Sequence, residues 1–183
     1  METPTTRMAL DLSSEDTRAI ANFTLLWSLY EGTILNTEGN ANKIIRVVRS
    51  LSAHGNLILK PFRDDIAYFS NRYYDGTDFT PEFHRLNFRS GDHRSLIEKV
   101  VLRQTTDEAE ILSAILIIIL RLRNNLFHGT KWSYEMKGQL ESFRHANSVL
   151  MAVIDLHRVS RALPSRPNTV TLAGTAAADE DRL

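Results

Sequence analysis

Residues 105–129 read TTDEAEILSAILIIILRLRNNLFHG, and this stretch decides the fold class of the chain. It opens with Thr105 and Glu108 at the spacing of a capping box, which closes the first turn of a helix. Residues 111–120 are all apolar except Ser113, around the whole helix and not along one stripe. This run is too short to cross a bilayer, which takes about 20 residues. We therefore predict a buried helix.

A helix that is apolar on every side must be covered on every side. Two arrangements provide that cover. The helix lies at the centre of a helical bundle, or a second subunit covers part of its surface. The sequence leaves both arrangements open.

The rest of the chain predicts further helices. Ser13 or Ser14 caps the first of them, and Glu15 and Asp16 occupy its first turn. No two neighbouring segments show the period-2 alternation of a strand pair around a hairpin turn. The additional helices are expected at residues 13–35, 40–53, 61–72, 92–104 and 133–161, with one helical turn after Pro81. The predicted fold is all-α, an up-and-down bundle of four to five helices.

Length and composition predict one helical domain at residues 13–163, between a flexible segment, 1–12, and a disordered tail, 164–183. The absence of cysteine excludes disulfides, thiolate zinc sites and a cysteine nucleophile. The N-terminal residues lack the basic and apolar parts of a secretion signal, so we expect a cytoplasmic protein with no membrane partner. The 22 basic and 22 acidic residues cancel, so no overall field attracts nucleic acid.

Polar side chains crowd the end of the apolar helix: Arg121, Arg123, Asn124, Asn125 and His128. Basic residues at this position often pair only with the last carbonyl groups of a helix, which is one interpretation. The other is a functional site. Arg123, Asn124, His128 and Gly129 have a chance expectation of about 0.002 at this spacing and composition, which favours a motif.

The segment RNNLFHG at residues 123–129 closely resembles the signature of HEPN domains, an arginine commonly followed by a polar residue and shortly afterwards by a histidine. In that family the motif lies at the end of a core helix of an all-α bundle. Residues 23–31, FTLLWSLYE, resemble the first helix of bacterial and phage-encoded members. The resemblance implies a stand-alone HEPN protein. Such proteins are often metal-independent endoribonucleases in toxin or antiviral systems.

The resemblance also implies the partners: RNA, a second copy of the chain that completes a composite active site, and an antitoxin or regulatory protein. Other HEPN proteins have lost activity and bind RNA, a nucleotide or a protein, and this is the alternative function. Overall neutrality favours a selective RNA target, such as a structured tRNA loop, over bulk RNA. We expect no cofactor and no metal, because His84 and His93 are too far apart in sequence for a helical metal pair.

Cleavage of RNA without a metal requires the 2′-hydroxyl to attack the adjacent phosphate, assisted by a group of near-neutral pKa and a fixed cation. We predict His128 as the general base or acid, Arg123 as the cation, and Asn124 as the residue that orients His128 or the phosphate. Arg121 also fits the family spacing and is the second candidate for the cation. On an ideal helix Arg123 and His128 lie about 140° apart. Either the helix unwinds before Gly129, or Arg123 works with His128 of the partner subunit.

Three further residues complete the candidate set. Lys131 and Trp132 would contact RNA through charge and stacking, whereas Trp132 alternatively packs at the start of the last helix. Glu31 on the first helix is a candidate polar partner for the arginine cluster.

Overall fold

The computed structural model describes residues 12–127 and 139–162, and almost all of its regular structure is helical. The elements are α2 (Ser14–Thr33), α3 (Ala41–Ala53), the 3₁₀ helix η1 (Lys60–Phe62), α4 (Arg63–Tyr73), α5 (Pro81–His84), α6 (Arg94–Val101), α7 (Glu108–Phe127) and α8 (Leu140–Ala162). The only strand-like pairing in these ranges is a single bridge between Tyr74 and Phe79. The predicted all-α class is confirmed. The described residues hold seven α-helices, more than the four to five expected, because α5 and α6 are short helices between the longer ones.

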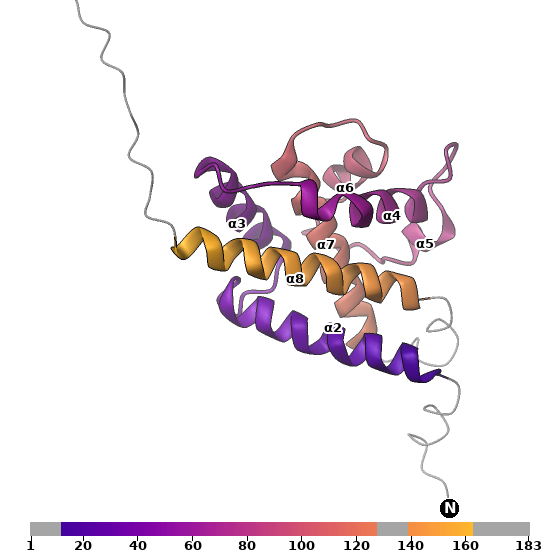
Figure 1. Cartoon of the computed structure of the whole chain (residues 1–183). Coiled ribbons are helices and arrows are strands. Elements are labelled where there is room, and N and C mark those ends of the chain that lie inside the picture. Colours follow the sequence, from indigo (N-terminus) through magenta and orange to yellow (C-terminus); the bar gives the residue numbers. More distant parts are fainter. Residues whose placement is uncertain (1–11, 128–138, 163–183) are drawn as a thin grey trace, which may run out of the picture.

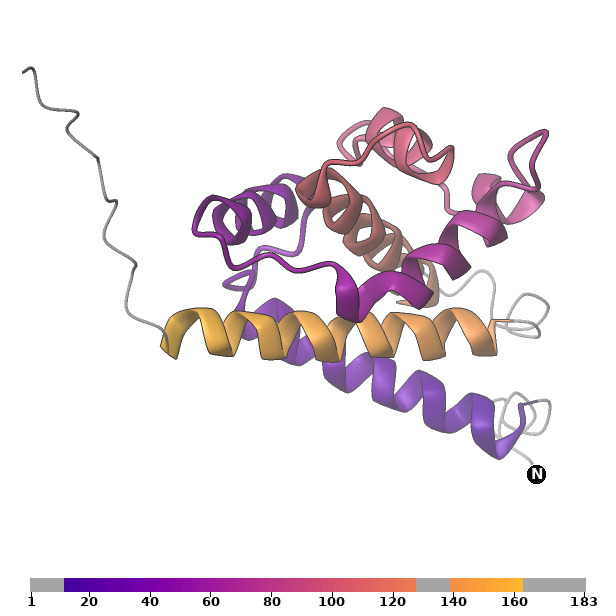
Figure 2. The ribbon, with the colours of Figure 1, turned by 45° about the horizontal axis from the view of Figure 1, so that its top comes forward.

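Helix α7 passes through the middle of the molecule, with α8 on one side and α3, α4 and α6 on the others (Figures 1 and 2). Every residue from Leu112 to Leu120 is at most 3% exposed. The chain itself therefore covers the apolar surface of α7. The interpretation that a second subunit supplies part of that cover is wrong.

Helices α2 and α8 lie side by side and run in the same direction (Figures 1 and 2). Their aromatic rings Phe23 and Phe143 pack with centroids 5.1 Å apart. The buried Asn147 side chain donates a hydrogen bond to the carbonyl of Ala19 at 3.0 Å. Apolar packing and a buried hydrogen bond thus hold α8 against α2.

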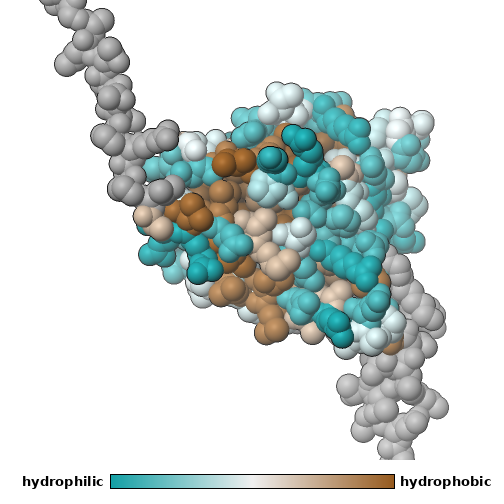
Figure 3. Space-filling model, in the orientation of Figure 1, coloured by the Kyte–Doolittle hydropathy of each residue, from teal (hydrophilic) through white to brown (hydrophobic). Residues whose placement is uncertain are grey.

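Exposed large apolar side chains occur on the same two helices. They are Leu25 and Leu29 on α2, and Met151 and Val159 on α8. Figure 3 shows apolar surface gathered over α2 and α8, with mainly hydrophilic surface over the end of the molecule that carries α4 and α5. In the described part of the chain, no helix combines the length and apolar content needed to cross a membrane.

Helix starts follow local capping rules, with one correction. Ser13, one of the two expected caps, caps α2, and it forms a capping box with Asp16. The predicted box of Thr105 and Glu108 is wrong, because α7 is capped two residues later. There Asp107 Oδ1 accepts from the backbone N–H of Glu110 at 2.9 Å. Thr105 instead donates its hydroxyl to the Glu110 carboxylate at 2.6 Å.

A buried carboxylate joins α4 to α8. Asp65 is 4% exposed, and its two oxygens accept from His145 Nδ1 at 2.7 Å and from Ser148 Oγ at 2.9 Å. The His145 ring stacks on Tyr68, with centroids 4.0 Å apart. These contacts fix how far α8 lies along α4.

Three predictions fall outside the described residues: the start of the last helix at residue 133, residues 1–11 of the predicted flexible segment 1–12, and the predicted tail 164–183.

Candidate functional site

The polar side chains at the end of α7 point in two directions. Arg121 and Asn125 are four residues apart, so they share one face of the helix, which contacts the loop 85–92. Arg123 and Asn124 lie on another face and contact α2 or each other. The predicted cluster is therefore two groups of residues with different surroundings.

Arg121 is buried against the loop. It is 2% exposed, and its Nε and Nη2 donate to the carbonyls of Leu86 and Asn87 at 3.0 and 2.6 Å. Its Nη1 lies 3.4 Å from Asp92 Oδ2, an ion pair without hydrogen-bond geometry. Burial lowers the pKa of Arg121 from its ordinary value, and the Asp92 carboxylate opposes that shift. Arg121, the second candidate for the catalytic cation, therefore binds the loop and stabilises its conformation.

Two more contacts fix the same loop. Asp92 is 7% exposed and accepts from the backbone N–H of Arg89 at 2.6 Å. Asn125 Nδ2 donates to the carbonyl of Arg85 at 3.0 Å. Asn87 adopts φ 51°, a left-handed conformation that asparagine tolerates better than most residues. The loop between α5 and α6 is therefore shaped by the polar end of α7.

Arg123 has a different environment. Its side chain is 34% exposed, and its Nη2 lies 3.7 Å from Glu31 Oε2. Its Nη1 donates to Asn124 Oδ1 at 3.1 Å. Its guanidinium carbon lies 5.9 Å from the centroid of the Trp27 ring, within cation–π range. The expected pairing of Glu31 with the arginine cluster is confirmed for Arg123.

Trp27 and Gly39 complete this arrangement. The Trp27 indole N–H donates to Glu31 Oε2 at 2.8 Å, so one carboxylate serves both the indole and the arginine. A Cβ atom at Gly39 would collide with the Glu31 carboxylate, so glycine lets the chain after α2 pass close to it. Spacing along the sequence assigns Trp27 to the apolar face of α2, and no local signal identifies Gly39. Both roles depend on contacts with other parts of the fold.

We name Arg123, Asn124, Glu31 and Trp27 the arginine site. It presents a partly exposed guanidinium whose position is set by a ring, an amide and a carboxylate. A guanidinium offers several N–H donors in a planar fork that matches the oxygens of a phosphate. The site can therefore bind an anionic group at the end of α7.

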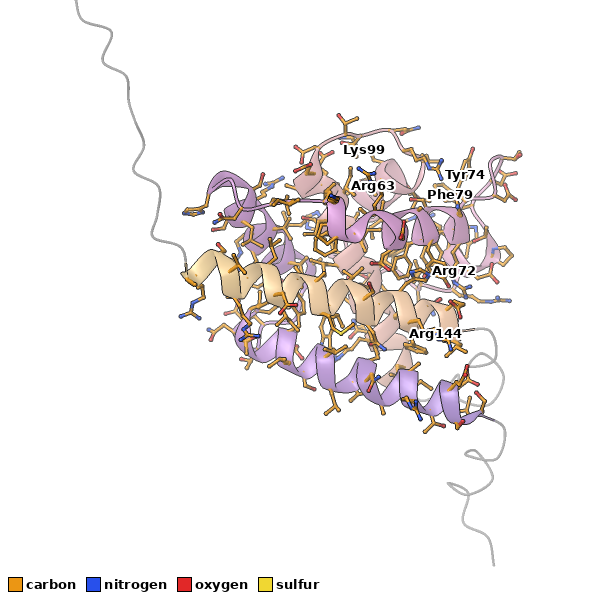
Figure 4. All side chains as sticks on the ribbon, viewed as in Figure 1. Arg63, Arg72, Tyr74, Phe79, Lys99 and Arg144 are labelled. Atoms are coloured by element: carbon orange, nitrogen blue, oxygen red, sulfur yellow. The ribbon has the colours of Figure 1, made fainter. Side chains whose placement is uncertain are left out.

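A pocket lies at the same end of α7, and its lining includes Asn125 but no residue of the arginine site. Its cavity volume is about 50 Å³, and it opens to the solvent. Its apolar lining is Tyr73, Leu86, Leu122, Leu126 and Phe143. Figure 4 shows Arg72, another lining residue, and Arg144 at the end of the molecule where α4 finishes and α8 begins.

The remaining predicted site residues, His128, Lys131 and Trp132, lie outside the described residues, as does Gly129. Helix α7 continues through Phe127. Within residues 12–127 and 139–162, no three His, Cys, Asp or Glu side chains are grouped to hold a metal ion.

Comparison of the chain with protein-family models, with curated proteins and with solved structures found no match. The case for a family therefore rests on the residues of the chain itself.

Proposed function

We propose that the protein is a metal-independent endoribonuclease of the HEPN type, acting in a toxin or antiviral system. The observation that carries the proposal is the arginine site. The arginine of the RNNLFHG motif is the partly exposed one at the end of the buried helix, while its neighbour two residues earlier is buried in the fold. A catalytic cation has to reach the phosphate, and Arg123 meets that requirement better than Arg121.

In this proposal each motif residue has a role. Arg123 stabilises the negative charge that grows on the phosphate when the 2′-hydroxyl attacks. Asn124 accepts a hydrogen bond from Arg123 and so positions the guanidinium. His128 takes the proton from the 2′-hydroxyl or delivers one to the leaving 5′-oxygen; this assignment comes from the sequence. The products carry a 2′,3′-cyclic phosphate and a 5′-hydroxyl.

Glu31 balances the charge of Arg123 when no RNA is bound. An ion pair of 3.7 Å with both partners partly exposed is weak, so breaking this pair adds little to the cost of binding a phosphate. Trp27 limits the movement of Arg123 during that exchange, because it contacts both members of the pair.

A homodimer is part of the proposal. Helix α7 is helical through Phe127, and on an ideal helix the five steps from Arg123 to His128 separate the two residues by about 140°. A dimer in which Arg123 meets His128 of the partner subunit removes this separation. The covered surface of α7 gives no support to the dimer, which rests on the motif geometry alone.

The test compares the wild type with His128→Ala and Arg123→Ala, incubated with total RNA and with a tRNA pool in EDTA. We expect the wild type to cleave a selected RNA, and each variant to lose on the order of 10²-fold or more in rate. His84→Ala is the matched control, because His84 is exposed on α5, away from the motif in sequence, and we expect full activity. Full cleavage by folded His128→Ala would refute the assignment.

The ion pair between Arg123 and Glu31 also favours a second candidate function. This is a catalytically silent module that binds RNA, a nucleotide or a protein. Absence of cleavage by the folded wild type, together with RNA binding that Arg123→Ala weakens, would select this function.

A further inference from the structure

His145, on α8, is held by two side chains of α4, one at an edge of its ring and one at a face. Its Nδ1 donates to Oδ1 of Asp65 at 2.7 Å, and its ring stacks on Tyr68 with centroids 4.0 Å apart. Ser148 donates to the other Asp65 oxygen at 2.9 Å. The Tyr68 hydroxyl is hydrogen-bonded to Ser142 Oγ at 3.0 Å. Because both partners of the imidazole are themselves fixed, the orientation of the ring is fixed as well.

The second ring nitrogen of His145, Nε2, is left to the solvent. In the part of the chain that the structure describes it has no hydrogen-bond partner, and it is not among the buried unpaired atoms. The His145 side chain is 26% exposed, whereas that of Asp65 is 6% exposed. Since Nδ1 carries the proton that it donates to the carboxylate, the lone pair of the neutral ring lies on Nε2. The Asp65–His145 dyad therefore presents a nucleophilic nitrogen of defined tautomer.

A histidine nitrogen of this kind can bind a metal, transfer a proton on a bound substrate, or attack an electrophilic group. Across residues 12–127 and 139–162, no three His, Cys, Asp or Glu side chains are grouped around a metal position. His145 is not among the residues that line the pocket at the end of α7. These observations favour attack on a group that a donor presents from the solvent.

Each of the two helices carries an arginine within about one turn of the contact between His145 and Tyr68. Arg72 follows Tyr68 by four residues, so it lies on the same face of α4, and Arg144 directly precedes His145. Figure 4 shows both arginines at the end of the molecule where α4 finishes and α8 begins. Arg144 also neutralises Glu141, one turn before His145, through an ion pair of 2.7 Å. These cations suit a phosphoryl group, which is anionic, better than an uncharged acyl group.

We propose that His145 is a phosphorylation site, whose Nε2 accepts a phosphoryl group from a donor of the phosphoramidate class. The Nε2 lone pair forms the new phosphorus–nitrogen bond. The phosphorus–nitrogen bond of the donor breaks, its electron pair stays with the donor nitrogen, and that nitrogen takes a proton from the solvent. The positive charge that develops on the His145 ring is stabilised by the Asp65 carboxylate through Nδ1–H. This site is independent of the proposed ribonuclease function.

The test incubates the full chain with potassium phosphoramidate and follows phosphorylation of each histidine by peptide mapping. His54 is the internal control, because its Nδ1 is also hydrogen-bonded, to the neutral carbonyl of Ser50 at 2.6 Å, and its side chain is exposed. We expect His145 to react about tenfold faster than His54, since a hydrogen bond to a charged acceptor exceeds one to a neutral acceptor by about 1 kcal/mol or more. In the urea-unfolded chain the two histidines should react at similar rates.

Asp65→Asn keeps an acceptor for Nδ1–H and removes the charge. It should slow phosphorylation of His145 about tenfold and leave His54 unchanged. Phosphorus NMR of the modified chain should show attachment at Nε2, and this signal should be absent in His145→Gln. The proposal is overturned if folded wild type modifies His145 no faster than His54, if the phosphoryl group is on Nδ1, or if folded Asp65→Asn reacts like the wild type. The comparison of His145 with His54 needs no variant, so it holds even if Asp65→Asn does not fold.

Discussion

Arg121 and Arg123 are two residues apart on one helix and have different physical roles. Arg121 replaces its hydration with two loop carbonyls and the Asp92 carboxylate, and these partners compensate for its burial. Arg123 keeps about a third of its side chain in solvent, and its ion pair with Glu31 is weak. The first arrangement stabilises a loop, whereas the second leaves a cation accessible to a ligand.

Replacing these two arginines should separate stability from ligand binding. Arg121→Met leaves Asp92 buried without its cation and two carbonyls without their donor, so we expect a loss of about 3–5 kcal/mol in the free energy of unfolding. Arg123→Met should cost about 1 kcal/mol or less. Urea unfolding of both variants measures this difference. Equal losses would contradict the assignment of Arg121 to the structure and Arg123 to the site.

At the scale of elements, polar contacts set how the helices are placed relative to one another. The Asp65 carboxylate on α4 accepts from two side chains on α8, His145 and Ser148. Apolar packing between helices tolerates some sliding, but two hydrogen bonds to one buried group specify a single position. In the same way, Arg121 and Asn125 on α7 specify the shape of the loop that lines the pocket.

Asp65→Ala tests the contact between α4 and α8. The change leaves the donors of His145 and Ser148 without their acceptor, and we expect a loss of about 1–3 kcal/mol in the free energy of unfolding. Asp64→Ala is the control in the same first turn of α4, since Asp64 is exposed and shares the favourable interaction with the helix dipole. Urea midpoints should fall clearly more for Asp65→Ala. Matching midpoints would show that the buried contact adds nothing to helix placement.

At the scale of the whole molecule, the functional features gather at one end of the central helix. The arginine site lies on one side of the α7 terminus and the pocket on another. The apolar body of α7 is enclosed by the other helices, which makes it a rigid support for the polar residues at its end. The fold therefore places a preorganised cation and a pocket at the same end of one helix.

A mixing experiment tests whether the active site is shared between two subunits. Arg123→Ala and His128→Ala are each expected to be inactive alone. If Arg123 works with His128 of the partner subunit, randomly mixed dimers should recover about a quarter of the wild-type activity, because half of them are hybrids with one intact site. If both residues act within one subunit, no hybrid site is intact and no activity returns. Sedimentation of the mixture verifies that dimers form.

Much of the helical architecture could be predicted, because its signals are local. The apolar run of 111–120 predicted a buried helix, and it is buried. Boundaries were less predictable where several residues can cap. Thr105 and Asp107 both offer a side-chain oxygen, and the engagement of Thr105 with Glu110 leaves Asp107 as the cap. The pairing of Glu31 with an arginine was expected, but which arginine was decided by packing.

The sequence by itself determined the helical class of this protein, the burial of α7 and the position of the RNNLFHG motif at its end, because these follow from residue types at short spacing. The tertiary structure decided which arginine is buried and where the pocket lies. It also decided that the backbone at Gly39 passes close to the Glu31 carboxylate. Each of these depends on contacts between segments far apart in the chain. Arg121 meets the carbonyl of Leu86, and Arg123 meets Glu31, only because packing of the helices brings those segments together.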